Sequence, residues 1–177
     1  YAKHSQDLAE SETHPLLHFL EFGASEGRDP HPLFDVNFYL ANNPGIAHSE
    51  TNPLVHYLRF GASRRFDPHP LFDTSFYMES NPDLLRPGEN PLLHFLRHGV
   101  NEGRSPHPLF DIAFYLKNYP DVARSGENPL IHFIVHGASS GRNPHPLFDN
   151  SYYLMNNPDV AHAGVNPLVH FIQHGAK

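Results

Sequence analysis

Histidine is the residue in this sequence whose type and spacing could support chemistry. Sixteen of the 177 residues are histidine. The motif Pro-Leu-x-His recurs every 38 residues, and each copy places a histidine at its fourth position. In the last three copies a second histidine follows four residues later. Two imidazoles at this spacing share one helix face and can bind zinc, copper or nickel. The first histidines of the five copies are His18, His56, His94, His132 and His170.

A further histidine lies in the repeated segment Pro-His-Pro-Leu-Phe-Asp. If that loop folds back, it would offer a third nitrogen to the metal, and the aspartate would offer an oxygen. The metal-site hypothesis therefore combines the pairs His94 and His98, His132 and His136, and His170 and His174 with the loop residues His107 and His145.

Two copies favour a structural role for the second histidine. Phe22 and Phe60 occupy the position of His98 in the first two copies. A phenyl ring cannot bind a metal, but it can replace an imidazole that packs against the next repeat. The first histidine would then hydrogen-bond a loop carbonyl across the repeat junction. We favour this structural interpretation and keep the metal array as the alternative.

Arginine and aspartate also recur. Arg28, Arg104 and Arg142 follow a glycine in a loop, where they could bind an anionic or sugar ligand beside aromatic rings. The alternative, which we favour, is a salt bridge to an acidic side chain of the loop or the adjoining repeat. Aspartate before an apolar segment is typical of a helix N-cap, worth about 1 kcal/mol. The predicted caps are Asp35, Asp73, Asp111 and Asp149.

The composition excludes several classes of function. The formal charge of −7 argues against a nucleic-acid partner and disfavours an anionic membrane surface. The absence of cysteine excludes disulfides and thiolate metal sites. No apolar run has the length of a membrane span, and no signal peptide is visible. Motifs of hydrolases, phosphate-binding loops and zinc proteases are absent, so we expect no catalysis in this chain.

These residues are carried by one repeated unit. Pro-His-Pro-Leu-Phe-Asp occurs at 30–35, 68–73, 106–111 and 144–149, and the sequence between the copies aligns at the same offset. A fixed period of this length predicts stacked repeats that bury their apolar sides against one another. Both ends fall inside a unit, so we expect the natural chain to be longer. The predicted array covers 1–177, with partial units 1–13 and 166–177 around full units 14–51, 52–89, 90–127 and 128–165.

The unit 90–127 predicts two helices joined by a loop. Asn90-Pro91 begins the first helix and Gly99 would end it, as N-cap and C-terminal glycine. On this helix Leu92 and Phe95 would face the core, with His94 on the opposite side. The second helix runs from 112 to about 119, and a short turn closed by Gly126 follows. Strand patterns are absent, so the predicted fold is an all-α solenoid.

The motifs resemble those of a known kind of repeat. Tyr152–Ala161, the Asn-Pro-Leu-x-His-Phe motif and the Gly-Arg-x-Pro loop are similar to tandem repeats of large bacterial proteins. Some of these accompany polysaccharide glycosyltransferases, and others belong to secreted calcium-binding proteins. The resemblance implies a scaffold role beside a catalytic or export module. The calcium-binding nonapeptide rich in glycine and aspartate is absent, so calcium is not implied.

The leading hypothesis is therefore a non-catalytic interaction scaffold that presents a repeated surface to a protein or glycan partner and needs no cofactor. The alternative is a histidine-based array that binds zinc, copper or nickel. The sequence indicates neither the oligomeric state nor the compartment, and both the bacterial cytoplasm and the cell surface stay open.

Overall fold

The computed structural model describes residues 14–49, 51–84 and 88–175. In these ranges the chain is helical and has no β-strand, as predicted; the extended elements are isolated bridges inside the Pro-His-Pro-Leu-Phe-Asp loops. The chain divides into two compact units, Tyr1–His69 and Pro70–Lys177. None of the helices in the described ranges has the length and apolar character needed to cross a membrane.

The first helix of each repeat has two parts. An α-helical turn begins at the proline after the capping residue, and a π-helical turn continues it without a break. The α-helical turns are α1 (Pro15–His18), α4 (Pro53–His56), α6 (Pro91–His94), α9 (Pro129–His132) and α12 (Pro167–His170). The π-helical turns are η3 (Phe19–Gly23), η4 (Tyr57–Gly61), η7 (Phe95–Gly99), η8 (Phe133–Gly137) and η9 (Phe171–Gly175). A short 3₁₀ turn, η5 (Ala62–Arg64), follows η4.

Local sequence explains where these helices begin. The Asn90 side chain accepts a hydrogen bond from the Leu93 N–H at 3.1 Å, which satisfies one of the free donors of the first turn. Proline follows at the first helical position, where no N–H is needed. In the first copy His14 replaces asparagine, and its Nδ1 accepts from the Leu16 N–H at 3.3 Å.

Each first helix ends at its glycine, as predicted, but this glycine does not act as a left-handed C-terminal cap. Gly99 lies inside the π-helical turn, and Val100 after it keeps right-handed helical angles. A Cβ added at Gly99 would overlap the Tyr77 hydroxyl, which comes from the preceding helix. The same overlap occurs for Gly61 with Tyr39 and for Gly137 with Tyr115. Glycine is thus required here because of close packing.

The left-handed position comes four residues later in the loop. Gly27, Gly103 and Gly141 have φ of 68°, 70° and 72° there, and the second copy places Arg65 at φ 61°. Glycine adopts this conformation without the Cβ penalty that other residues meet.

The second helix and a short third helix complete each repeat. The second helices are α2 (Val36–Asn42), α5 (Thr74–Ser80), α7 (Ile112–Asn118) and α10 (Asn150–Asn156). The third helices are α3 (Pro44–Ala47), the 3₁₀ turn η6 (Pro82–Leu84), α8 (Pro120–Ser125) and α11 (Pro158–Ala163). Gly126 and Gly164 end α8 and α11 in the left-handed conformation, in the place where the sequence predicted a closing glycine.

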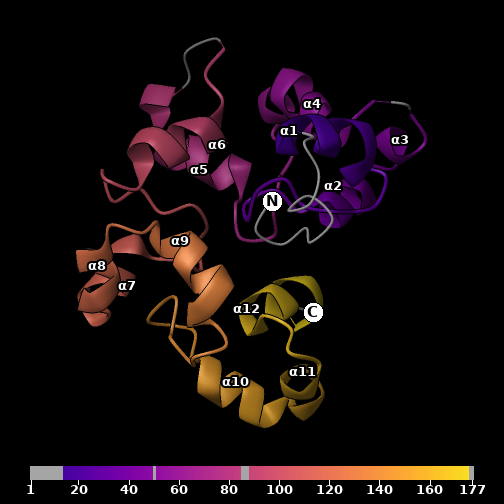
Figure 1. Cartoon of the computed structure of the whole chain (residues 1–177). Helices are drawn as coiled ribbons and strands as arrows, with labels where there is room; N and C mark the ends of the chain where they lie inside the picture. The colour runs from indigo at the N-terminus through magenta and orange to yellow at the C-terminus, as the bar shows by residue number, and fades with distance from the viewer. Residues whose placement is uncertain (1–13, 50, 85–87, 176–177) are drawn as a thin grey trace. The chain divides into compact units, whose positions relative to one another are not determined.

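The helices that pack together do not belong to one predicted unit. The second and third helices of one unit contact the first helix of the next, as α7 and α8 do with α9, and α10 and α11 with α12 (Figure 1). We call each such group, with the phenylalanine that precedes it, a packing module. The described packing modules are 34–61, 72–99, 110–137 and 148–175.

Each packing module has an equivalent cluster of three aromatic rings, with Tyr57 in place of the second phenylalanine in the first module. In module 72–99, Phe72 precedes α5, Tyr77 lies on α5, and Phe95 begins η7; all three side chains have zero exposure. Their ring centroids are 5.3–5.8 Å apart, and Tyr77 meets Phe95 edge-on at 88°. Such tilted and edge-on pairs are the favoured arrangements of aromatic rings.

Successive loops are joined by one backbone hydrogen bond. The Asp35 N–H donates to the Pro68 carbonyl at 2.9 Å, Asp73 to Pro106 at 3.0 Å, and Asp111 to Pro144 at 3.1 Å. We call this series the loop ladder. It connects the packing modules 34–61, 72–99 and 110–137 to the loop of the next repeat.

Candidate binding surface

The first histidine of each repeat is held by a tyrosine of the preceding repeat. The tyrosine hydroxyl lies within hydrogen-bond distance of the imidazole Nδ1, 17 residues later in the chain. The pairs are Tyr39 and His56 at 2.8 Å, Tyr77 and His94 at 3.0 Å, Tyr115 and His132 at 2.9 Å, and Tyr153 and His170 at 2.7 Å. The tyrosine that would match His18 is Tyr1, outside the described residues.

This geometry corrects two expectations. The hydrogen-bond partner of the first histidine is a tyrosine hydroxyl and not a loop carbonyl. His94 is also only 8% exposed, so it lies with the core side chains and not on the opposite face of the helix. A polar imidazole can be buried here because Tyr77 satisfies its Nδ1.

Sequence reasoning missed the tyrosine, although a signal for it was present. The second helices read Phe-Tyr-Leu, Phe-Tyr-Met, Phe-Tyr-Leu and Tyr-Tyr-Leu, so the second residue is tyrosine in all four copies while its neighbours vary. Burial raises the pKa of Tyr39, Tyr77 and Tyr115 above the usual range. The hydroxyls therefore keep their protons at neutral pH and can donate to the imidazoles.

The second histidine packs against the first. The ring centroids of His94 and His98 are 5.5 Å apart, those of His132 and His136 are 5.8 Å apart, and those of His170 and His174 are 5.0 Å apart. Phenylalanine takes the same place in the earlier copies, with His56 and Phe60 at 5.8 Å and His18 and Phe22 at 5.6 Å. The ring thus contacts the histidine of its own helix, where the sequence analysis expected the next repeat.

Replacing His98 with phenylalanine should therefore change the free energy of unfolding by less than about 0.5 kcal/mol, the range of exposed substitutions. His98 is exposed, and the second copy already places Phe60 against His56 with nearly the same separation. Urea denaturation of the variant and the parent chain checks this. A loss of several kcal/mol would show that His98 makes a contact that phenylalanine cannot replace.

The loop histidines stabilise the turn of their own loop. Nδ1 of His31, His107 and His145 accepts a hydrogen bond from the backbone N–H two residues later, at 3.1, 3.0 and 3.1 Å. Asp111 of the same loop accepts instead from the Phe114 N–H at 2.9 Å, as the predicted N-cap of the second helix. The other aspartates also occupy the N-cap: Asp35, Asp73 and Asp149 accept from the N–H groups of Phe38, Phe76 and Tyr152.

Burial makes several of these histidines hard to protonate. It lowers the pKa of His107 to about 4 and also lowers the pKa of His31, His56 and His132. For the last two, a nearby arginine charge adds to this effect. Protonation would also remove the Nδ1 lone pair that accepts from the loop N–H.

Acidification should therefore destabilise the chain between pH 6.5 and about 4. In this window the unfolded state, with histidine pKa near 6.5, binds more protons than the native state, so the free energy of unfolding falls as pH falls. We expect a loss of roughly 1–3 kcal/mol between pH 7 and pH 4.5. Urea denaturation across this pH range measures it.

His107→Asn is the matched control for this pH dependence. An asparagine side chain can accept from the N–H two residues later in the same turn, but it does not titrate. The variant should fold at pH 7 and lose less stability on acidification than the parent chain. An unchanged pH profile would show that His107 does not contribute.

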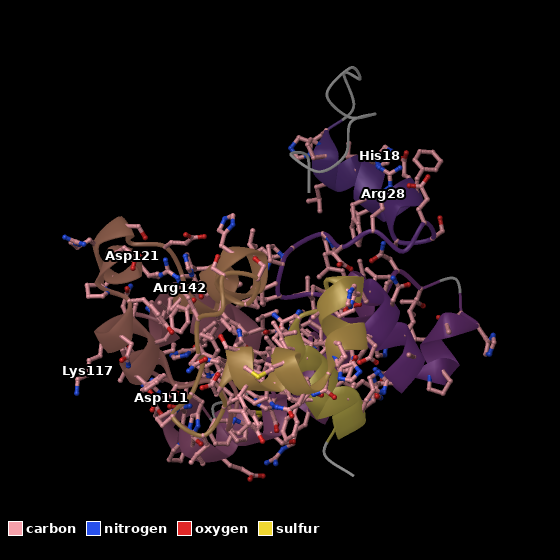
Figure 2. The ribbon with its side chains drawn as sticks, turned by 90° about the horizontal axis from the view of Figure 1, so that it is seen from below. His18, Arg28, Asp111, Lys117, Asp121 and Arg142 are labelled. Carbon is pink, nitrogen blue, oxygen red and sulfur yellow. The ribbon has the colours of Figure 1, made fainter. Side chains whose placement is uncertain are left out.

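The loop arginines are engaged by carboxylates. Arg104 donates to both carboxylate oxygens of Asp83, each at 2.8 Å, and also contacts Glu102. Arg142 binds Asp121 in the same two-pronged way at 3.0 and 2.7 Å, and Figure 2 shows these two side chains together. Arg28 pairs with Glu26 at 2.7 Å. Hydrogen bonds from the arginines lower the pKa of Asp83 and Asp121.

These pairs correspond to the salt-bridge alternative of the sequence analysis. Arg142 also lies 4.9 Å from the centroid of the Tyr119 ring. Asp83 and Asp121 lie on η6 and α8, so each arginine links a loop to the short third helix of the preceding repeat. An anionic ligand would have to displace a carboxylate before it could bind Arg104 or Arg142.

Two hollows occupy equivalent positions three repeats apart. One has a volume of about 450 Å³ and the other of about 340 Å³. We call them the junction hollows, because each is lined by the first, second and third helices of one repeat and by the start of the next. Their matching apolar residues are Leu20, Leu40, Ile46 and Pro53 in the first and Ile134, Leu154, Val160 and Pro167 in the second. Their matching polar residues are Ser25 and Asn52, and Ser139 and Asn166.

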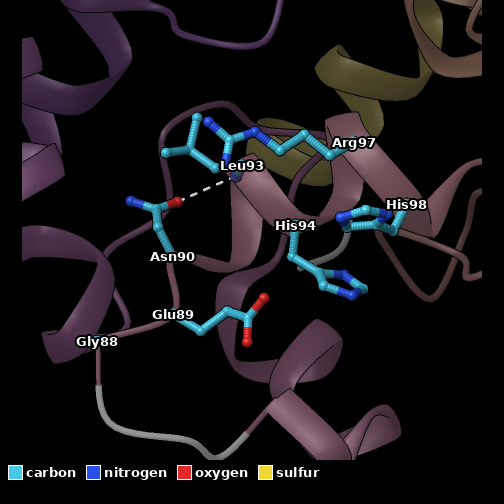
Figure 3. Close-up of a pocket in the computed structure, with 7 residues that line it drawn as sticks. All are labelled: Gly88, Glu89, Asn90, Leu93, His94, Arg97 and His98. Atoms are coloured by element: carbon cyan, nitrogen blue, oxygen red, sulfur yellow. Dashed lines mark hydrogen bonds between the residues drawn. The ribbon is translucent and has the colours of Figure 1, made fainter.

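A third hollow, of about 430 Å³, is lined in part by His94 and is more polar than the junction hollows (Figure 3). Its lining combines an acidic, a basic and two imidazole side chains with the apolar Leu93. The lining residues are Gly88, Glu89, Asn90, Leu93, His94, Arg97 and His98.

The described residues contain no group of three or more histidine, aspartate or glutamate side chains placed to hold a metal ion. The comparisons find no matching protein family, no similar curated protein and no similar solved structure.

Proposed function

We propose that this chain is a non-catalytic scaffold of helical repeats that binds a protein or glycan partner through equivalent surfaces. In this proposal the repeats continue as an α-solenoid with a period of 38 residues. The observation that carries the proposal is the recurrence of the junction hollow with matched linings. Repeated hollows with an apolar floor and a few hydrogen-bonding groups suit a ligand that itself repeats.

The resemblance to repeats of large bacterial proteins supports a setting for this scaffold. We place it beside a polysaccharide-processing or cell-surface module, which it would hold near its substrate or partner. The chemistry would belong to that module, because the first histidines, the loop arginines and the capping aspartates bond other side chains or the backbone.

A glycan array and a pull-down from bacterial lysate test the scaffold. The binding of any ligand found is then measured for a variant in which both junction hollows are filled, Ala47→Phe with Ala161→Phe. Both alanines are exposed and line the hollows, so the folded core should tolerate the change. The matched control is Ala41→Phe with Ala163→Phe, at exposed positions of α2 and α11 that do not line the hollows.

Loss of binding in the filled chain, with binding kept in the control, is the expected result. Equal binding by both chains would show that the ligand does not bind in the junction hollows. An absence of any glycan or protein ligand would contradict the scaffold itself.

The second candidate is the transition-metal array, which the close imidazole pairs favour. In each pair the Nδ1 of the first histidine faces a tyrosine, which leaves its Nε2 as the metal-binding atom. Calorimetry with zinc, copper and nickel on tag-free protein should show about one tight site per pair. The triple variant with His98, His136 and His174 changed to phenylalanine should lose those sites, and weak heats at millimolar metal alone would contradict this candidate.

A further inference from the structure

The loop of the second repeat differs from its equivalents in charge. In the other copies two glutamates and a serine occupy the position of Arg64, and a glycine occupies the position of Arg65. Both arginines are exposed, and so is Arg59 on the preceding π-helical turn. Three positive side chains are therefore gathered within residues 59–65 of a chain whose formal charge is −7.

The carboxylate that binds the loop arginine elsewhere is replaced at this junction. In the third repeat Arg104 binds Asp83, which lies on the third helix of the preceding repeat. At the two equivalent positions the chain has Phe66 and Gly45, so the arginine and the aspartate are exchanged together. A Cβ added at Gly45 meets no atom within 4 Å, so the place of the aspartate side chain is open.

Arg64 contacts an aromatic ring and no carboxylate. Its guanidinium lies 5.8 Å from the centroid of the Phe60 ring, and the ion pairs of the described residues do not include it. The Phe60 side chain is 48% exposed. Burial raises the pKa of Tyr39 and the charge of Arg64 opposes this rise, whereas at the equivalent Tyr77 carboxylates act together with the arginine.

Arg65 has a backbone conformation that glycine adopts in the other three copies. Its φ is 61°, and no other residue of the described ranges apart from glycine has a positive φ. This conformation is unfavourable for a residue that carries a Cβ. Such conformations are concentrated at functional sites, so an arginine in this place indicates a binding role for its charge.

We propose that Phe60, Arg64 and Arg65 bind an acidic peptide segment of a partner protein. Carboxylates of the partner bind the guanidinium groups, as Asp83 binds Arg104 within this chain, and an apolar side chain of the partner packs on the exposed part of the Phe60 ring. Clusters of arginine are a known means of recognising acidic motifs.

The composition of this surface favours a peptide over other ligands. Its charged groups are arginines, which suit carboxylates better than the neutral hydroxyl groups of a sugar. The overall negative charge disfavours a nucleic acid. None of the three proposed residues lines a junction hollow, so this site is separate from the surfaces of the proposed function.

Fluorescence anisotropy with labelled synthetic peptides tests the proposal. A peptide of glutamate and leucine residues should bind, and the same peptide with glutamine in place of glutamate should bind at least about tenfold more weakly. Arg64→Glu introduces the residue of the first and third repeats, so the chain should fold and binding should fall at least about tenfold. The control is Arg124→Glu, at an exposed position of α8, which changes the net charge equally and should leave binding unchanged.

Arg65→Gly separates binding from stability. It introduces the residue of the other three copies, so the free energy of unfolding should not fall, whereas peptide binding should weaken about threefold or more. The variant with filled junction hollows should bind the peptide like the parent chain, which tests this site independently of the hollows.

Several results would overturn the proposal. These are a parent chain that does not bind the glutamate peptide, equal binding of the glutamate and glutamine peptides, and equal effects of Arg64→Glu and Arg124→Glu. Unchanged binding by the Arg65→Gly chain or lost binding by the filled variant would do the same. Tighter binding of polygalacturonate or single-stranded DNA than of the peptide would show that the partner belongs to another class.

Discussion

Replacing Phe95 with alanine should lower the free energy of unfolding by about 3–5 kcal/mol, the usual cost of truncating a buried aromatic ring. Phe95 has zero exposure and packs against Phe72 and Tyr77. These neighbours belong to a separate loop and a separate helix, and Tyr77 is also held by His94, so they cannot move together to fill the cavity. Urea denaturation followed by helical circular dichroism measures the loss.

Phe60→Ala is the control for this variant. Phe60 also lies on a first helix, but it is 48% exposed, so its truncation should cost less than about 1 kcal/mol. A Phe95→Ala variant with the stability of the Phe60→Ala variant would show that the aromatic core does not hold the packing module together.

Replacing Gly61 with alanine should cost about 1–3 kcal/mol, the range for an added methyl group in a packed interior. This is the reverse of the usual effect in a helix, where alanine is more stable than glycine. The reason is the Tyr39 hydroxyl, which occupies the place of the new Cβ and is held there by His56 at 2.8 Å. The variant must move the tyrosine and strain this bond.

Two further variants separate the effect of the steric clash on stability from the effect of helix propensity. Gly45 lies in α3 with no atom within 4 Å of an added Cβ, so Gly45→Ala should stabilise the chain by roughly 0.5–1 kcal/mol. Tyr39→Phe removes the hydroxyl, so Gly61→Ala should cost less in that background than in the parent chain. A Gly61→Ala cost that is equal in both backgrounds would exclude the hydroxyl as its cause.

The sequence predicted the features that depend on neighbouring residues. Asn90-Pro91 begins a helix, Asp111 begins another, and Gly126 ends the short third helix, because each of these acts on backbone groups within a few residues. The all-helical fold followed from these signals together with the absence of alternating apolar patterns. The proposed solenoid and the length of its period go beyond what these local features establish.

The features that sequence reasoning missed depend on contacts between helices. Gly99 ends its helix as predicted, but the reason for glycine at this position is the hydroxyl of Tyr77, which comes from a residue 22 positions earlier in the chain. His94 looked like a surface residue because a helical wheel does not show a tyrosine on another helix. The metal-site hypothesis rests on imidazole spacing, and the sequence does not show that the Nδ1 of each first histidine faces a tyrosine hydroxyl.

The tyrosine–histidine bond has a consequence for how such a chain can change its length. Each bond joins one repeat to the next through a tyrosine and a histidine at equivalent positions. With respect to this bond, the four junctions are interchangeable. Recombination between misaligned copies of the coding sequence would remove or add whole units and still leave a tyrosine facing a histidine at each new boundary. Copy number can therefore evolve without new interfaces having to arise.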